Sequence, residues 1–323
     1  TPEDDLDPAG RTYAVLREIK EILDEAGVVM NSAVCNLHGN KIFRNGGLCN
    51  PDPEIRRLAK LPRVVGLAEV MDFVGVAQGD DRMMDIIQAA EENGLYIQGH
   101  LPAADPRLVS AYMCGGPTTC HETRTAELAA LKMRSGMFVD ARQSSISFDV
   151  KEVLRDTKDF PWLDHLCLCT DDREADDILH SGHMDFVAKF AVACGLSGVQ
   201  AVRSATYNTA REANLKNLGA VAPGYVADML LVDDLVDFRV ASVYYGGKLV
   251  AQDGKLLADI PQQSYPIEAR DSMNVPELTL EDFRMKAPAG CGGAVNINIL
   301  NYASPAPHSF YPYTHIGTFK HTI

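Results

Sequence analysis

The chain has 323 residues, of which 46% are hydrophobic and 23% are charged, and this is the composition of an ordinary soluble globular protein. A chain of this length can form one large domain with an appendage. The formal net charge of −14 argues against nucleic acid or an anionic membrane as a partner. We find no apolar run long enough to span a bilayer and no leader resembling a signal peptide, so we expect a cytoplasmic protein. We also expect it to form a homo-oligomer.

Short apolar runs alternate with helical stretches over most of the chain. Proline or an acidic cap opens several of the helical stretches, and glycine closes them. The expected helices are 8–26, 53–61, 81–94, 105–114, 123–136, 174–194 and 197–214. The expected strands are 27–37, 64–69, 95–99, 115–120, 137–145 and 164–172. This alternation predicts an α/β domain over residues 1–217.

The residue pattern of the sequence changes near Leu218. Strand-like alternation and turn glycines follow, including the hairpin pattern Asp253-Gly254. We therefore expect a small β-domain over residues 218–323, ending in an irregular tail from about residue 286 with one possible strand at residues 296–300. The eight cysteines are scattered, include no C-x-x-C pair, and are expected to be buried thiols.

Four side chains that commonly bind metal ions lie at the ends of successive apolar runs. Their spacings of 31, 21 and 50 residues fit one or two strand-plus-helix units of about 30 residues. Because the strands of a β/α barrel end at one rim, residues placed there form one site. The pattern predicts a metal-dependent hydrolase with the ligands Glu69, His100, His121 and Asp171. Imidazole suits Zn, Fe or Mn, and carboxylate adds a preference for Mn.

Several segments resemble the bacterial adenine deaminases of the amidohydrolase superfamily, in the same order over roughly residues 55–260. The combination of Glu-Val-Met at 69–71, His-Glu at 121–122 and Thr-Asp-Asp at 170–172 is the specific part of the resemblance. The similar segments are VVGLAEVMDF (64–73), GHLPAAD (99–105), CHETRTAELAALKMRSGMF (120–138), CLCTDDREADDILHSGHMDF (167–186), AVRSATYNTA (201–210) and LGAVAPGYVADMLLVDDL (218–235).

The resemblance implies a (β/α)8 TIM-like barrel with a small β-sandwich built from the two chain ends. It implies hydrolytic deamination of adenine to hypoxanthine and ammonia by a metal-bound hydroxide. The cofactor would be one or two divalent ions, Mn or Fe, with Zn as a third option. By this resemblance, Glu69 bridges the metals, His100 and His121 are ligands, and Asp171 is both a ligand and the proton shuttle.

Three further positions are candidates for the site. Glu122, directly after His121, either contacts the substrate in a catalytic role or only pairs with Arg124. The resemblance places Arg142 and His183 near the substrate, although a histidine that merely begins a helix is an alternative for His183.

The chain also departs from the family pattern. It has no His-x-His pair, and the strand expected at 27–37 is best matched to the third barrel strand, so the first two have no counterpart. Gln143-Ser144-Ser145 replaces the family's Glu-Gly-Ser. Two alternatives therefore stay open: another amidohydrolase acting on a cyclic or N-acyl amide, and a truncated inactive paralogue. Glu69, in place of a carboxylated lysine, argues against the first.

Overall fold

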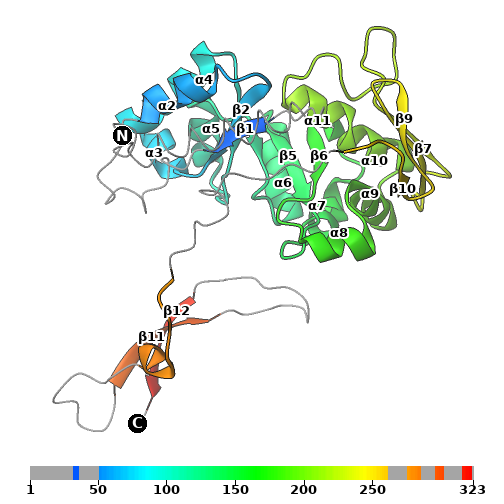
Figure 1. The fold of residues 1–323 in the computed structure, drawn as a ribbon. Helices are drawn as coiled ribbons and strands as arrows, with labels where there is room; N and C mark the ends of the chain where they lie inside the picture. The colour runs from blue at the N-terminus through cyan, green and yellow to red at the C-terminus, as the bar shows by residue number, and fades with distance from the viewer. Residues whose placement is uncertain (1–31, 36–50, 261–274, 285–294, 302–314, 322–323) are drawn as a thin grey trace, which may run out of the picture.

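A computed structural model describes residues 32–35, 51–260, 275–284, 295–301 and 315–321. Parallel strands alternate with helices along the first two thirds of the described chain, which confirms the predicted mixed α/β class (Figure 1). The parallel strands form two three-stranded sheets, ordered β1-β2-β3 and β4-β5-β6. Their bounds are β1 Ser32–Cys35, β2 Val64–Val70, β3 Tyr96–Gly99, β4 Thr119–Cys120, β5 Phe138–Arg142 and β6 Leu166–Cys169.

Two hydrogen bonds join the adjacent edges of these sheets. Thr118 N donates to Ile97 O at 3.4 Å, and Gly99 N donates to the Thr119 hydroxyl at 3.1 Å. Glycine is required at position 99 because a Cβ there would lie only 2.2 Å from the Thr119 carbonyl oxygen. The close approach of β3 and β4 brings the strand ends of both sheets to one region.

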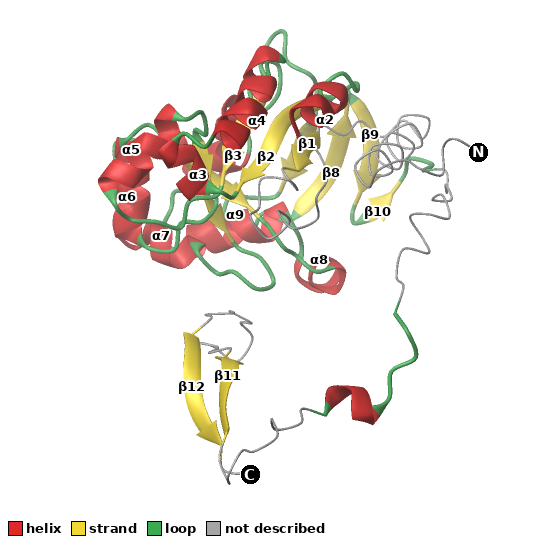
Figure 2. Ribbon diagram, turned by 90° about the vertical axis from the view of Figure 1, so that its left-hand side faces the viewer, coloured by secondary structure: helices red, strands yellow, loops and turns green. Residues whose placement is uncertain are grey.

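The helices connect successive parallel strands, and Figure 2 shows α2 and α4 together on one side of β1, β2 and β3. Asp80, Asp105 and Thr125 accept backbone N–H bonds at the starts of α4, α5 and α6, as their sequence positions indicate. The helix bounds are α2 Pro51–Leu58, α3 Phe73–Gln78, α4 Asp81–Glu92, α5 Pro106–Cys114, α6 Ala126–Arg134, α7 Val150–Thr157, η2 Leu163–His165, α8 Ala175–Ser181, α9 Met184–Ala193, α10 Gly198–Ala205, α11 Tyr207–Glu212 and η3 Leu280–Phe283.

Two of the expected helices are broken. Gly182, with φ of 100°, separates α8 from α9 within the expected helix 174–194. Thr206, with φ of −132° and ψ of −80°, separates α10 from α11 within the expected helix 197–214. The second break matters most, because it lets α11 turn toward β6, where Asn208 donates to the Leu163 and Leu166 carbonyls.

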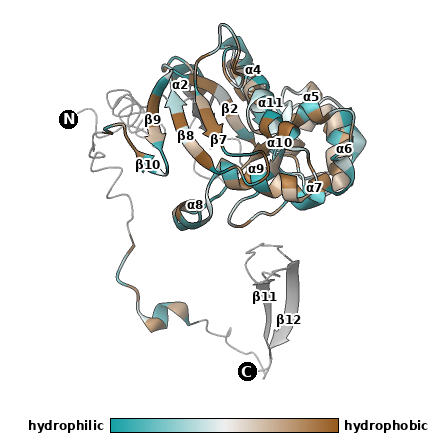
Figure 3. Cartoon of the chain, turned by 90° about the vertical axis from the view of Figure 1, so that its right-hand side faces the viewer, coloured by the Kyte–Doolittle hydropathy of each residue, from teal (hydrophilic) through white to brown (hydrophobic). Residues whose placement is uncertain are grey.

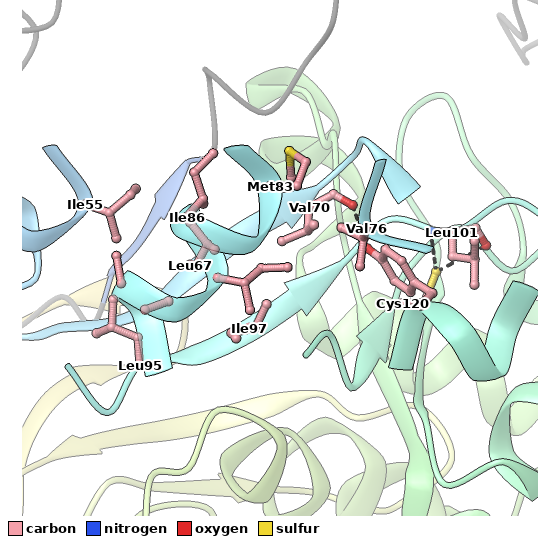
Figure 4. Close-up of a cluster of buried hydrophobic side chains, with 14 of the residues drawn as sticks. Ile55, Leu67, Val70, Val76, Met83, Ile86, Leu95, Ile97, Leu101 and Cys120 are labelled. Carbon is pink, nitrogen blue, oxygen red and sulfur yellow. Dashed lines mark hydrogen bonds between the residues drawn. The ribbon is translucent and has the colours of Figure 1, made fainter. Parts of the chain in front are cut away.

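Each parallel sheet packs its own apolar core. Figure 4 shows the first core, in which Leu67 of β2 and Ile97 of β3 pack against Met83 and Ile86 of α4. The second core joins β5 and β6 to α7, α9 and α10. A fully buried side chain such as Leu67 contributes about 1.5–3 kcal/mol relative to its exposed state. The two cores hold the strands rigidly beneath their polar carboxyl ends.

Antiparallel structure begins after α11. The strands β7 Met229–Val232, β8 Val240–Tyr245, β9 Lys248–Gln252 and β10 Lys255–Leu256 form one sheet in the order β10-β9-β8-β7. Asp253 and Gly254 make the two-residue turn between β9 and β10, both with positive φ, which confirms the predicted hairpin. Apolar Leu230 and Leu231 of this sheet are more than half exposed, and Figure 3 colours parts of its strands brown, which marks hydrophobic residues.

The terminal segments differ in part from expectation. The possible strand at residues 296–300 is confirmed as part of β11 Val295–Asn301, whereas its antiparallel partner β12 His315–His321 lies in a segment that we expected to be irregular. Apolar-polar alternation in Val295–Leu300 is the sequence feature that favours this pairing. The expected helix 8–26 lies outside the described residues.

Candidate metal centre

Glu69, His100 and His121 meet at the carboxyl ends of β2, β3 and β4. Glu69 Oε1 lies 3.1 Å from His121 Nε2 and 3.8 Å from His100 Nδ1. The two imidazole nitrogens are 3.1 Å apart. The His121 side chain is only 7% exposed, whereas that of Glu69 is 37% exposed, so the cluster opens to solvent on one side.

These separations fit a shared cation. Donor atoms placed 2.0–2.2 Å from a tetrahedral ion stand about 3.4 Å from one another. One donor atom from each of the three residues lies within 4.8 Å of the others, so a cation could touch all three after small shifts. Two imidazoles and one carboxylate suit Zn, Fe or Mn better than the all-oxygen surroundings that Mg and Ca prefer.

Two residues at this rim have left-handed backbone conformations. Glu69 has φ of 46° and Asp171 has φ of 51°, and neither is glycine. The β2–β3 pairing is also irregular between Leu67 and Val70, so the strand is distorted where Glu69 leaves it. Such conformations cost about 1–3 kcal/mol each and are concentrated at functional sites.

Tyr112 of α5 fixes the position of His100. Its buried hydroxyl donates to Val70 O at 2.5 Å and accepts a hydrogen bond from His100 N at 3.0 Å. Burial raises the pKa of Tyr112, so the hydroxyl keeps its proton at every ordinary pH. This one hydroxyl therefore ties the end of β2 to the end of β3.

Lys132 of α6 fixes the backbone around His121. Its buried ammonium donates to Leu101 O at 2.7 Å, Glu122 O at 2.8 Å and the Thr123 hydroxyl at 3.0 Å, and its Nζ lies 3.1 Å from Cys120 Sγ. Burial lowers its pKa despite these partners. Sequence reasoning missed Lys132, since the only indication is its position between apolar neighbours in a helix.

Arg142, at the end of β5, is the centre of a buried charge network. Its Nη1 donates to Glu122 Oε1 at 2.5 Å and to Asp171 Oδ2 at 3.0 Å, and its Nε donates to Asp149 Oδ2 at 2.8 Å. Glu122 also accepts from Arg124 at 3.1 Å. Burial would raise the pKa of Glu122, but the charges of Arg142 and Arg124 outweigh it and lower the pKa. Glu122 is therefore a carboxylate at neutral pH.

The residues expected from the sequence thus fall into three groups. The structure brings Glu69, His100 and His121 together, whereas Asp171 is bonded to Arg142 beside them. The Asp171 charge nevertheless contributes to the raised pKa of His121. His183 is exposed at the start of α9. Within the described residues, its ring makes no contact with the other site residues.

The charges at the rim stabilise one another. Hydrogen bonds from His100 and His121 outweigh the cost of burial and lower the pKa of Glu69 well below its usual range. Burial alone would lower the pKa of His121, but the bond to Glu69 and the charges of Asp140 and Asp171 raise it overall. The cluster therefore attracts a proton or another cation.

Comparison with known proteins identifies the family. The model of the amidohydrolase family matches residues 49–250. The chain belongs to the amidohydrolase family. This amidohydrolase is 35% identical over 243 residues to the adenine deaminase of Kosmotoga olearia, covering 75% of the chain and 42% of that protein. It is 37% identical over 256 residues to the adenine deaminase of Nitratidesulfovibrio vulgaris strain DP4, covering 79% and 44%.

The amidohydrolase spans less than half the length of these two curated relatives. Among solved structures it is similar to the N-acetylglucosamine-6-phosphate deacetylase of Pasteurella multocida, with a TM-score of 0.52 and 15% identity. That match covers 76% of this chain and 74% of the deacetylase, and it shows a shared fold alone. Within the described residues, no helix combines the length and apolarity needed to cross a bilayer.

Proposed function

We propose that this amidohydrolase chain carries the catalytic site of an adenine deaminase, which converts adenine and water to hypoxanthine and ammonia. The observation that carries the proposal is the Glu69–His100–His121 cluster at the strand ends. Support for the substrate comes from the relatives named adenine deaminase, which are 31–37% identical to this chain. The net charge of −14 argues against a nucleic acid as the substrate.

Glu69, His100 and His121 are the proposed ligands of a divalent ion, Mn or Fe, with Zn as a third option and one or two ions in all. When bound, such an ion supplies Lewis acidity, lowering the pKa of a water ligand toward about 7. Glu69 contributes the negative charge, and its unusual backbone conformation aims the carboxylate at both imidazoles. His121, almost fully buried, fixes the inner side of the site.

Asp171 is the proposed proton carrier. Its side chain is 22% exposed, so it can exchange protons with the site and with solvent. Its Oδ2 accepts from Arg142, which holds the carboxylate in place and leaves the other oxygen to take a proton from the attacking water. The same proton can then pass to the purine ring or to the departing amine. The proposed ligand role of Asp171 would require a second ion near this oxygen.

Arg142 and Glu122 are proposed to act around the substrate. Arg142 uses Nη1 and Nε on carboxylates, while Nη2 is buried and has no hydrogen-bond partner among the described residues. That N–H group can donate to a purine nitrogen or to the product carbonyl. Glu122 orients the guanidinium at 2.5 Å and can contact the substrate amine. His183 lies between α8 and α9, and a substrate-binding role for it is also a proposal.

The wider architecture belongs to the same proposal. We infer that residues 1–217 form part of a (β/α)8 barrel and residues 218–323 a separate small β-domain of sandwich type. Support comes from the consecutive parallel strands β1 to β6 and from the change to antiparallel pairing at β7. In this arrangement the proposed site lies at the rim where the parallel strands end.

The direct test supplies the purified chain with Mn(II), Fe(II) or Zn(II) and adenine. Ammonia and hypoxanthine are measured together, because equal amounts of both are expected from deamination. Glu69→Gln should abolish the reaction, whereas Glu152→Gln, on the exposed face of α7, should not change it. A folded, metal-loaded chain that releases neither product would overturn the proposal, and hydrolysis of a cyclic or N-acyl amide instead would favour another amidohydrolase reaction.

A further inference from the structure

A second group of metal-binding side chains lies beneath the rim. Asp140 of β5, Cys167 of β6 and Glu212, the last residue of α11, each place one donor atom within 4.8 Å of the other two. Asp140 and Cys167 are direct partners in the parallel β5–β6 register. Their side chains therefore leave neighbouring strands at the same height and on the same face.

This cluster is distinct from the rim. Arg142 and Cys169 are the next register pair on that face, two residues closer to the strand ends, and Arg142 is the residue that reaches Asp171. Asp140 and Cys167 lie one layer deeper, in the part of the strands that is normally apolar. Neither residue has a role in the proposed deamination.

Asp140 and Cys167 are buried, Glu212 is partly buried, and the cluster lacks a described counter-ion. Asp140 is 4% exposed and Cys167 is 1% exposed. Asp140 Oδ2 is fully buried and has no hydrogen-bond partner among the described residues. Within the described residues, no lysine, arginine or histidine forms an ion pair with Asp140 or Glu212. His121 and Lys132 are close enough for their charges to lower the pKa of Asp140, but His121 contacts Glu69 and the Lys132 ammonium donates elsewhere.

Two carboxyl groups and a thiol without a counter-ion are costly to bury together. An unpaired buried carboxylate costs several kcal/mol or becomes protonated. A cation that all three donors can reach removes this cost. Thiolate is a soft donor and selects ions of the zinc class over Mg and Ca, and the two carboxylates balance the charge.

We propose that Asp140, Cys167 and Glu212 form a second, structural metal site that binds Zn²⁺ or a chemically similar divalent ion. The ion would join β5, β6 and α11, which come from three separate parts of the chain. Each ligand that holds a proton releases it to solvent when the ion binds. This site is independent of the proposed deaminase activity.

The protonation of the free cluster agrees with this assignment. Burial raises the pKa of Glu212, Asp140 and Cys167 above their usual values, and the neighbouring carboxylate charges add to the effect on Glu212 and Cys167. The metal-free cluster therefore holds protons more strongly than three exposed side chains of these types would. Metal binding should accordingly release more protons than the rim site alone, whose Glu69 is already ionised.

The experiment is a titration of the metal-free protein with Co²⁺, followed by absorption in the near ultraviolet. A thiolate bound to Co²⁺ gives an intense charge-transfer band, which imidazole and carboxylate ligands do not give. The rim cluster contains no sulfur, so Glu69→Gln should keep the band. Cys167→Ser should remove it, and Asp140→Asn or Glu212→Gln should weaken Co²⁺ binding at this site by at least about 100-fold.

Cys169→Ser is the matched control, because Cys169 lies two residues away on the same strand and face. This variant should keep the band. X-ray absorption at the cobalt edge of the wild-type protein must show a sulfur neighbour, and this measurement holds even if Cys167→Ser fails to fold. A wild-type protein without the band and without a sulfur neighbour, or a band that persists in folded Cys167→Ser, would overturn the proposal in favour of a shared proton.

Discussion

The Glu69 carboxylate lies 3.1 Å from Nε2 of His121, although the two residues belong to different three-stranded sheets. The contact exists because β3 and β4 approach each other at Gly99 and Thr119. His100, directly after β3, lies within 3.8 Å of both Glu69 and His121. The proposed metal site is therefore also a junction between the two halves of the parallel structure.

Replacement of Glu69 by glutamine should reduce metal affinity by at least about 100-fold, since even residues that only orient a ligand cost 10–100-fold. The amide keeps the shape of the side chain but removes the charge that both imidazoles face. Metal content after dialysis measures the effect directly, and adenine turnover should fall in parallel. Glu152→Gln is the control, and equal metal content in both variants would show that Glu69 is not a ligand.

The metal-free protein should lose stability as pH rises above about 6.5. The pKa of His121 is raised in the folded state, so its stabilising charge is present below the unfolded value of 6.5 and is lost above it. The pKa of Glu69 is lowered, so its contribution is present above 4.5 and is lost as pH falls. Urea unfolding in EDTA across pH 4 to 9 measures both trends.

His121→Gln provides the comparison for that pH profile. The glutamine cannot become charged, so the loss of stability above pH 6.5 should disappear while the loss at acid pH becomes smaller. A His121→Gln profile that matches the wild-type curve would assign the alkaline loss to another group.

Replacement of Arg142 by methionine should destabilise the protein by about 3–5 kcal/mol, because buried Glu122 and Asp149 would lose their common partner. Arg155 is a matched control on the surface, where it also pairs with three carboxylates. Arg155→Met should cost much less, since exposed pairs are screened by solvent. Urea midpoints of the two variants test the difference, and similar midpoints would contradict the buried network.

Replacement of Tyr112 by phenylalanine should cost about 1–3 kcal/mol, because Val70 O and His100 N would lose their shared partner in a buried setting. The variant should also bind metal more weakly, since the backbone of His100 would no longer be held. Tyr245→Phe, at a position that is 42% exposed, should change neither property. Thermal unfolding with and without metal checks both effects, and unchanged metal affinity in Tyr112→Phe would separate the hydroxyl from the site.

Strand-end residues could be recognised from the sequence because position along a parallel strand determines which edge a residue reaches. Glu69, His100 and His121 each follow a short apolar run, and the structure brings them together. Asp171 follows such a run as well, but its contact is with Arg142. The local sequence pattern predicts the edge of the sheet at which a side chain lies. Which partner that side chain contacts depends on the register of the strands and on which neighbouring groups can bind it.

Other partners could not be foreseen because they join distant segments through buried polar contacts. Lys132 lies in α6 and Tyr112 lies in α5. The periodicity of these helices does not distinguish the two residues from ordinary surface or core residues. Asp140 is an interruption in the apolar strand Phe138–Arg142, which indicates that a carboxylate is buried but does not identify its partner. Glu212 reaches it only because the chain turns at Thr206.

The sequence alone determined the alternation of strands and helices, the family resemblance and the edge on which the candidate ligands lie, because these depend on local periodicity and residue spacing. Tertiary structure decided the β3–β4 junction, the Arg142 network and the buried Asp140–Cys167–Glu212 cluster. Those features depend on interstrand register and on the close packing of side chains that are far apart in the chain, and no local pattern records either one.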